Sequence, residues 1–367
     1  MTARFAPALL GSAITRRDVL LRASTAGLAV VVSGLGRTVH GQSKPIRTVM
    51  LAHSDNSTVY AQHMVADTMG FFKEAGLQAE FIVPGGGARV TQIIAGDQAP
   101  FAQGDSAHPV LVSARGRPCQ MVYSTDTRCA YANILLRKEL WEQGLNTVEK
   151  LATMKRPDGS PRVIAATAIG SGTWVYGSYV LSQYQVNGKS VNDQVKWVGG
   201  GGSTTILGGL KSGQFDAVMA VPLWIETAVR DGYGHLLYDV RSEMDWVRVF
   251  KGNIPTTVGY VLKKTLDNEP EMSQDYVTAM WRAQQWIKGR DPEQVYDAIG
   301  KKFMPTFAKE VVLAEIRYYQ PMFNYDMTIS RQDFENSKRV LIPLVTDKDY
   351  SYDALVDMRF VEKARKG

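Results

Sequence analysis

The chain has 367 residues, of which 45% are hydrophobic and 21% are charged, so it can bury more than one core and is not a disordered polyelectrolyte. Its formal charge of +6 comes mainly from residues 1–41, which hold five arginines and one aspartate. The remaining residues carry 37 basic and 35 acidic side chains. Because this remainder is nearly neutral, we expect no nucleic-acid partner.

Residues 1–41 resemble a bacterial twin-arginine export signal. Arg16 and Arg17 form the arginine pair, and an apolar stretch over 23–35 follows that is too short and too rich in glycine to span a bilayer. A small-residue cleavage site precedes Gln42. We expect this segment to direct export to the periplasm. An ordinary N-terminal helix and a retained membrane anchor are the alternatives.

Short β-like runs alternate with helix-like runs through the next two hundred residues. The predicted strands are 47–52, 79–83, 101–103, 120–124, 162–166, 195–198, 217–221 and 236–240. The predicted helices between them are 59–74, 89–95, 108–114, 173–184, 204–211 and 224–230. Strands that alternate with short helices indicate mostly parallel sheets that are covered on both faces.

From residue 265 onward the pattern is helical, with apolar and aromatic residues at helical spacing. The predicted helices are 272–287, 292–301, 309–319 and 331–340. We interpret their apolar faces as packing surfaces and not as a cofactor site.

An internal similarity links residues 81–88 and 196–203. Each segment runs from a strand into a glycine cluster and is followed by an apolar helix, a glycine and another short strand. This repetition predicts two related lobes. The alternative is a chance similarity between two strand–glycine–helix units of one sheet.

The glycine and serine motifs do not match those of known catalytic sites. The glycine clusters at 85–90, 170–175 and 200–205 all lack the sixth-position glycine of a dinucleotide-binding fingerprint. Ser171 lacks the glycine that precedes the nucleophile of a serine hydrolase by two residues. The five histidines form no metal-binding pair. We therefore expect no catalytic residue, no metal and no cofactor.

The two cysteines, Cys119 and Cys129, leave two possibilities open. An exported protein meets an oxidising compartment in which a disulfide can form. Two free buried thiols are the alternative, because the sequence does not give the distance between them.

Four strand-to-helix junctions are rich in small and hydroxyl residues, namely 54–58, 104–108, 170–173 and 202–204. Each follows the C-terminal end of a predicted strand, where open α/β sheets bind ligands. Each also begins a helix, whose free N–H groups attract anionic or polar groups. Simple N-capping by Asp105, Ser106, Ser171 or Ser203 is the alternative, and a cap contributes only about 1 kcal/mol. Four such junctions in two related lobes favour a shared cleft.

The order and spacing of several short motifs resemble the extracytoplasmic solute-binding proteins of ABC importers. The branch in question serves aliphatic sulfonates, taurine, nitrate and thiamine-pyrimidine precursors. The matching segments are 71–77, 84–87, 94–97, 114–118, 170–173, 208–213 and 215–217.

The resemblance implies an α/β, two-lobed type II periplasmic binding protein fold. Each lobe would be a mostly parallel sheet flanked by helices, with a hinge between the lobes. The implied boundaries are 1–41 for the twin-arginine signal, 45–128 for the first part of lobe 1, 129–255 for lobe 2, and 256–367 for the second part of lobe 1 with the C-terminal helices.

The family's ligand contacts map onto four segments of this sequence, and a fifth segment, 222–224, faces them. The implied ligand-binding residues are Ser54, Asp55, Asn56, Ser57, Asp105, Ser106, Thr125, Asp126, Arg128, Ser171, Gly172, Thr173, Trp174, Pro222 and Trp224. Tyr131 is a further candidate for an aromatic wall. Arg128 would pair with a ligand carboxylate or sulfonate, or else is a surface arginine. Many relatives carry an acidic residue where this chain has Val221. This difference argues against a ligand that bears an amine group.

The resemblance implies a non-catalytic periplasmic protein that captures a small organic ligand, anionic or aromatic, and delivers it to an inner-membrane ABC permease. We expect it to be a monomer. A periplasmic sensor for a membrane receptor and a pyrimidine-synthesis-like enzyme on the same fold are the alternatives.

Overall fold

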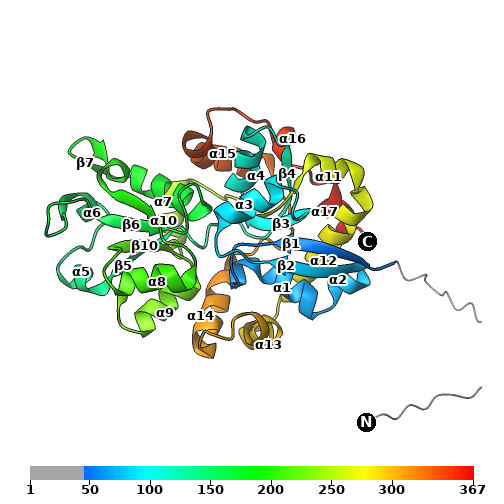
Figure 1. Ribbon diagram of the computed structural model, residues 1–367, viewed down its shortest axis with the longest axis horizontal. Helices are drawn as coiled ribbons and strands as arrows, with labels where there is room; N and C mark the ends of the chain where they lie inside the picture. Colours follow the sequence, from blue (N-terminus) through cyan, green and yellow to red (C-terminus); the bar gives the residue numbers. More distant parts are fainter. Residues whose placement is uncertain (1–44) are drawn as a thin grey trace, which may run out of the picture. The chain divides into compact units, whose positions relative to one another are not determined.

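The computed structural model describes residues 45–367, whose longer strands form two five-stranded sheets (Figure 1). The first sheet has the order β2-β1-β3-β12-β4 and the second has the order β11-β5-β10-β6-β9. The strands of the first sheet are β1 (Arg47–Ala52), β2 (Leu77–Ile82), β3 (Phe101–Asp105), β4 (Cys119–Ser124) and β12 (Thr257–Leu262). Those of the second are β5 (Asn133–Arg137), β6 (Val163–Ala166), β9 (Lys196–Gly199), β10 (Ala217–Ala220) and β11 (Gly234–Tyr238). A separate hairpin pairs β7 (Gln185–Val186) with β8 (Lys189–Ser190).

Four of the five strands in each sheet run in one direction, so the prediction of mostly parallel sheets is confirmed. The reversed strands are β12, which lies between β3 and β4, and β5, which lies between β10 and β11. Each is the first strand after the chain passes from one sheet to the other. The sequence analysis missed both strands, because neither stands in a strand–helix alternation.

The two sheets repeat one topology. Read from β2, the first sheet runs β2-β1-β3-β12-β4, and read from β9, the second runs β9-β6-β10-β5-β11. The similar segments 81–88 and 196–203 therefore include the ends of two edge strands, β2 and β9, in equivalent positions. Since these strands belong to different sheets, the alternative of two units within one sheet is wrong.

Helices lie close to each place where the sequence predicts one, whereas the helices at 138–142, 150–153, 191–194 and 243–250 were not predicted. The first group is η1 (Thr58–Tyr60), α1 (Ala61–Thr68), α2 (Phe71–Glu74), α3 (Gly87–Ala95), α4 (Ala107–Ala114), α5 (Lys138–Glu142), α6 (Lys150–Thr153), α7 (Gly172–Ser182), η2 (Val191–Gln194), α8 (Ser203–Lys211), α9 (Pro222–Arg230) and α10 (Glu243–Phe250). The single helix predicted over 59–74 is divided, because Gly70 adopts the left-handed conformation (φ 77°).

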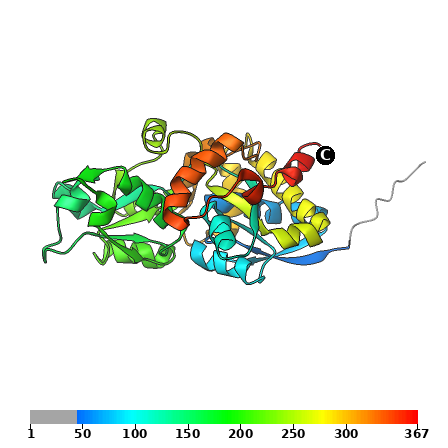
Figure 2. The same cartoon turned by 90° about the horizontal axis from the view of Figure 1, so that it is seen from above.

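The C-terminal part of the chain consists of helices. They are α11 (Lys263–Asn268), α12 (Pro270–Ile287), α13 (Pro292–Phe303), α14 (Lys309–Tyr319), η3 (Gln320–Met322), α15 (Arg331–Val345), α16 (Tyr352–Leu355) and α17 (Arg359–Ala364). Helix α12 packs on α1 and α17, whereas α14 packs on α9. Helix α15, the long orange-red helix of Figure 2, lies against both α4 and α7. Helices α14 and α15 thus pack against α9 and α7, two helices that follow strands of the second sheet. Within residues 45–367, no helix has both the length and the apolar character of a membrane span.

Both cysteines are buried free thiols. Cys119 begins β4, and Cys129 lies in the segment that leads to β5. Of the two possibilities that the sequence leaves open, the structure shows the free thiols. The predicted export signal lies outside the described residues.

Candidate functional site

A cavity of about 50 Å³ lies among loops that follow strands of both sheets. The first sheet contributes the loops after β1, β2 and β3, and the second contributes the loops after β6, β9 and β10. The volume leaves room for a few water-sized groups. A larger ligand would therefore need side chains or loops to move.

Eight of the fifteen residues implied by the resemblance line this cavity. They are Ser54, Asp55, Ser57, Asp105, Ser171, Gly172, Thr173 and Trp224. The other seven, which are not among the lining residues, are Asn56, Ser106, Thr125, Asp126, Arg128, Trp174 and Pro222. The cavity is also lined by Val59, Tyr60, Gly85, Gly86, Gly87, His108, Tyr131, Thr167, Gly202 and Val221.

Asp126 joins the two segments that connect the sheets. Its carboxylate accepts hydrogen bonds from the backbone N–H groups of Thr256 (2.8 Å) and Thr257 (2.9 Å), from the Thr256 hydroxyl (2.8 Å) and from the Tyr319 hydroxyl (2.6 Å). Thr125 donates its backbone N–H to the Thr257 carbonyl at 2.9 Å. These contacts give both residues a structural role at the crossing.

Asn56 anchors the loop after β1 to a buried hydrogen-bonded chain. Its Oδ1 lies 3.1 Å from His53 Nε2, and His53 Nδ1 lies 3.1 Å from His63 Nδ1. His63 Nε2 then lies 2.8 Å from the hydroxyl of Tyr276 in α12. Burial lowers the pKa of His53 to about 4 and that of His63 well below its ordinary value, so both rings are neutral near pH 7.

Four further residues implied by the resemblance are also not among the lining residues. Ser106 contacts the hydroxyl of Tyr176 at 3.3 Å, and Pro222 is the buried first residue of α9. Trp174 is partly buried and packs against the core. Arg128 has a buried Nη1 that finds no hydrogen-bond partner in the part of the chain that the structure describes.

Asp105, the last residue of β3, contacts residues outside the first sheet. Its Oδ1 accepts the backbone N–H of Ala107 (2.7 Å), and its Oδ2 accepts a hydrogen bond from the hydroxyl of Tyr131. Its carboxyl group packs on Gly172, where a Cβ would overlap it. Burial raises the pKa of Asp105 to about 7, although the bonds from Tyr131 and Ala107 oppose that rise.

Asp55 makes a second contact across the cavity. Its carboxylate accepts hydrogen bonds from the backbone N–H of Asn56, at 2.8 Å, and from the hydroxyl and backbone N–H of Ser203. Ser203 is the first residue of α8. Burial raises the pKa of Asp55, and these hydrogen bonds oppose that rise.

The loop before α7 is built from three hydroxyl side chains. The Ser171 hydroxyl caps the helix by accepting the Trp174 N–H, and it lies 2.9 Å from Thr167 Oγ1 and 2.8 Å from Thr173 Oγ1. Thr173 Oγ1 also accepts the Thr167 backbone N–H at 3.0 Å. The residues of this junction therefore cap α7 and also line the cavity. The two interpretations of the sequence, a ligand site and a simple helix cap, are compatible here.

The glycine clusters of the two sheets approach each other closely. A Cβ on Gly202 would lie 3.2 Å from the backbone oxygen of Gly85. A Cβ on Gly87 would lie 2.7 Å from His108 Nε2. Small residues thus allow the two loops, and the imidazole of His108, to meet at the cavity.

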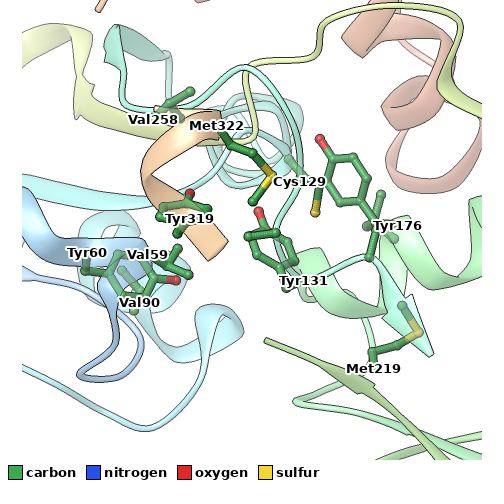
Figure 3. Close-up of a cluster of buried hydrophobic side chains, with 14 of the residues drawn as sticks. Val59, Tyr60, Val90, Cys129, Tyr131, Tyr176, Met219, Val258, Tyr319 and Met322 are labelled. Carbon is green, nitrogen blue, oxygen red and sulfur yellow. The ribbon is translucent and has the colours of Figure 1, made fainter. Parts of the chain in front are cut away.

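Apolar and aromatic surface forms the rest of the wall. Figure 3 shows Tyr131 between Tyr176 on one side and Val59 and Tyr60 on the other. The rings of Tyr131 and Tyr176 meet edge to face with centroids 5.9 Å apart. Trp224, at the start of α9, adds a buried indole to the lining.

No group of three or more His, Cys, Asp or Glu residues within 45–367 could hold a metal ion. The site contains hydrogen-bonding groups and aromatic surface arranged around a small cavity. This arrangement suits non-covalent binding of a small molecule.

A sequence model of the NMT1-like family matches residues 43–299. The chain belongs to the NMT1-like family. This NMT1-like chain has the periplasmic binding protein fold of its structural neighbours.

Three relatives illustrate the range of the similarity. YtlA of Bacillus subtilis (strain 168), a candidate binding protein, is 21% identical over 335 residues, which cover 88% of this chain and 91% of YtlA. The periplasmic nitrate-binding protein NrtA of Synechocystis PCC 6803 superimposes with a TM-score of 0.69 and 14% identity, over 88% of this chain and 89% of NrtA. The alkanesulfonate-binding protein SsuA of Xanthomonas axonopodis pv. citri, bound to MOPS, gives a TM-score of 0.62 and 13% identity over 86% and 99% of the two chains.

Proposed function

We propose that this NMT1-like protein is the extracytoplasmic solute-binding component of an ABC importer, which captures a small organic molecule and delivers it to a membrane permease. The observation that carries the proposal is the cavity itself, because six loops from two sheets of identical topology converge on it. The binding functions of NrtA and SsuA, which have the same fold, support the proposal. Both names describe periplasmic or substrate-binding proteins and not catalysts.

We further propose that residues 45–128 and 256–367 form one lobe and residues 129–255 the other. The hinge would consist of the two segments that Asp126 joins. Ligand contacts with both lobes would then stabilise closure, as in hinge-type domain movements. The protein would act in the periplasm as a monomer.

Native mass spectrometry of the protein purified from its own cells tests the function directly. We expect a bound small molecule that is lost on unfolding and that raises the melting temperature when it is added back. Cells that lack the gene should lose uptake of that compound. If no compound from cell extract binds, the proposal is wrong.

A further inference from the structure

Three helices of the second sheet begin at acidic side chains that come from other parts of the chain. One of these side chains follows β1, another is the last residue of β3, and the third lies in α14. The pairs are Asp55 with Ser203 of α8, Asp105 with Gly172 of α7, and Glu315 with Leu223 of α9.

Glu315 is the most enclosed of the three. It is fully buried, and its Oε2 accepts the backbone N–H of Thr58 (3.0 Å) and the Thr58 hydroxyl (2.7 Å). The backbone N–H of Leu223 also interacts with this carboxylate. Because helix N-termini attract negative charge, these carboxylates occupy the positions at which an anionic ligand would gain most.

In the described part of the chain, the cavity lining has two carboxyl groups and no lysine or arginine beside them. Among the described residues that line it, Asp55 and Asp105 are acidic, and none is lysine or arginine. Arg89, which lines a neighbouring surface groove, is exposed and donates to the Pro84 carbonyl at 3.1 Å. A buried sulfonate or nitrate would therefore lie beside two carboxyl groups without a cationic partner, which is unfavourable.

A separate observation comes from His108, in the first turn of α4. Its imidazole is buried and lines the cavity, and its Nδ1 lies 3.3 Å from the Tyr260 hydroxyl. Its Nε2 has no hydrogen-bond partner among residues 45–367. Buried polar atoms in proteins are nearly always paired, so this nitrogen indicates a contact that a ligand completes.

Building on the proposed function, we infer that the ligand of this chain presents a positively charged nitrogen group, such as an ammonium or amidinium, to Asp55 and Asp105, and a hydrogen-bonding group to His108 Nε2. Desolvation of the two carboxylates supports the inference, since a cation would offset its cost. Val221, which follows β10 of the second sheet, stands where many relatives carry an acidic residue. In this chain Asp55 and Asp105 supply carboxyl groups from the first sheet instead.

Matched probes of opposite charge test this inference by calorimetry on the full protein. Propylammonium and benzamidinium are compared with propanesulfonate, benzenesulfonate and nitrate. We expect the cations to bind, and Asp55→Asn and Asp105→Asn each to raise their Kd at least about tenfold. Asp347→Asn, which alters an exposed carboxylate in the loop after α15, should leave the Kd unchanged.

A double variant distinguishes charge recognition from a structural role. Asp55→Asn with Asp105→Asn removes both charges but leaves the helix N-termini, so we expect it to bind propanesulfonate more tightly than the wild type does. Thermal melting verifies that each variant is folded.

Tighter binding of a sulfonate or nitrate than of the cations by the wild type would overturn the inference and leave the proposed function intact. An anionic compound recovered from cells would overturn it as well, whereas the absence of any bound compound would count against the function itself.

Discussion

The carboxyl group of Asp105, at the end of β3, packs directly on Gly172, the first residue of α7. This contact joins a strand of one sheet to a helix of the other, with no room for a side chain between them. It explains why a glycine begins α7 after the Ser171 cap.

Gly172→Ala should disrupt this contact. The added methyl group would overlap the Asp105 carboxyl, so we expect the affinity for the cell-derived ligand to fall at least about tenfold, measured by calorimetry. The matched control is Gly208→Ala in α8, where an added Cβ meets nothing within 4 Å. There the affinity should stay constant and stability should rise by up to about 1 kcal/mol. Equal affinities of the two variants would contradict the prediction.

Asp126→Asn should destabilise the whole protein. The asparagine cannot accept all four hydrogen bonds that the buried carboxylate accepts, so we expect the free energy of unfolding to fall by about 3 kcal/mol in urea titrations. Asp347→Asn should change it by less than about 0.5 kcal/mol. A similarly small effect at Asp126 would show that it does not hold the crossing segments together.

Asp105 should make stability depend on pH. Its pKa is about 7 in the folded protein and near 3.8 in the unfolded chain, so the folded form keeps a proton that the unfolded form has lost. This contribution is fully present below about pH 4 and is lost as the pH rises through 7. The hydroxyls of Tyr131 and Tyr176, the Cys129 thiol and the carboxyl group of Asp126 surround the group.

Comparison with Asp105→Asn isolates this effect. The lowered pKa values of His53 and His108 act in the opposite direction, because their stabilising contribution is lost as the pH falls below 6.5, but they are common to both proteins. Between pH 5 and 8 the wild type should lose about 2 kcal/mol relative to the variant in urea titrations. Parallel pH profiles would refute the assignment.

The cysteines should be insensitive to redox conditions in the native protein. Burial raises the pKa of both thiols, which keeps them protonated and unreactive. We expect the melting temperature to be the same with and without a reductant, and both thiols to react with a thiol reagent only after unfolding. A mass two units lower for the untreated protein would reveal a disulfide instead.

The sequence predicted the elements that follow the strand–helix alternation, and missed those that depend on contacts distant along the chain. Strands such as β1 and helices such as α14 were found because their own periodicity defines them. The reversed strands β5 and β12 acquire their places from neighbours on other parts of the chain. No local pattern predicts such pairing.

The same distinction applies to the site. Junction residues such as Ser54 and Ser171 line the cavity because parallel strands bring their C-terminal ends to one edge. Asp126 was predicted as a ligand contact, yet its partners at Thr256 and Thr257 lie some 130 residues later. His108 belongs to the predicted junction 104–108 but was not among the implied ligand-binding residues, because the resemblance assigned contacts only to Asp105 and Ser106 there.

The position of β12 has a consequence for the order in which the chain folds. The second sheet takes all its strands from one uninterrupted stretch, residues 133–238, so it can form as soon as that stretch has left the ribosome. In the first sheet, the position between β3 and β4 stays unfilled until residues 257–262, which form β12, have been synthesised. The half that is synthesised first is therefore the half that finishes last, and until then the unpaired edges of its early strands need protection from aggregation.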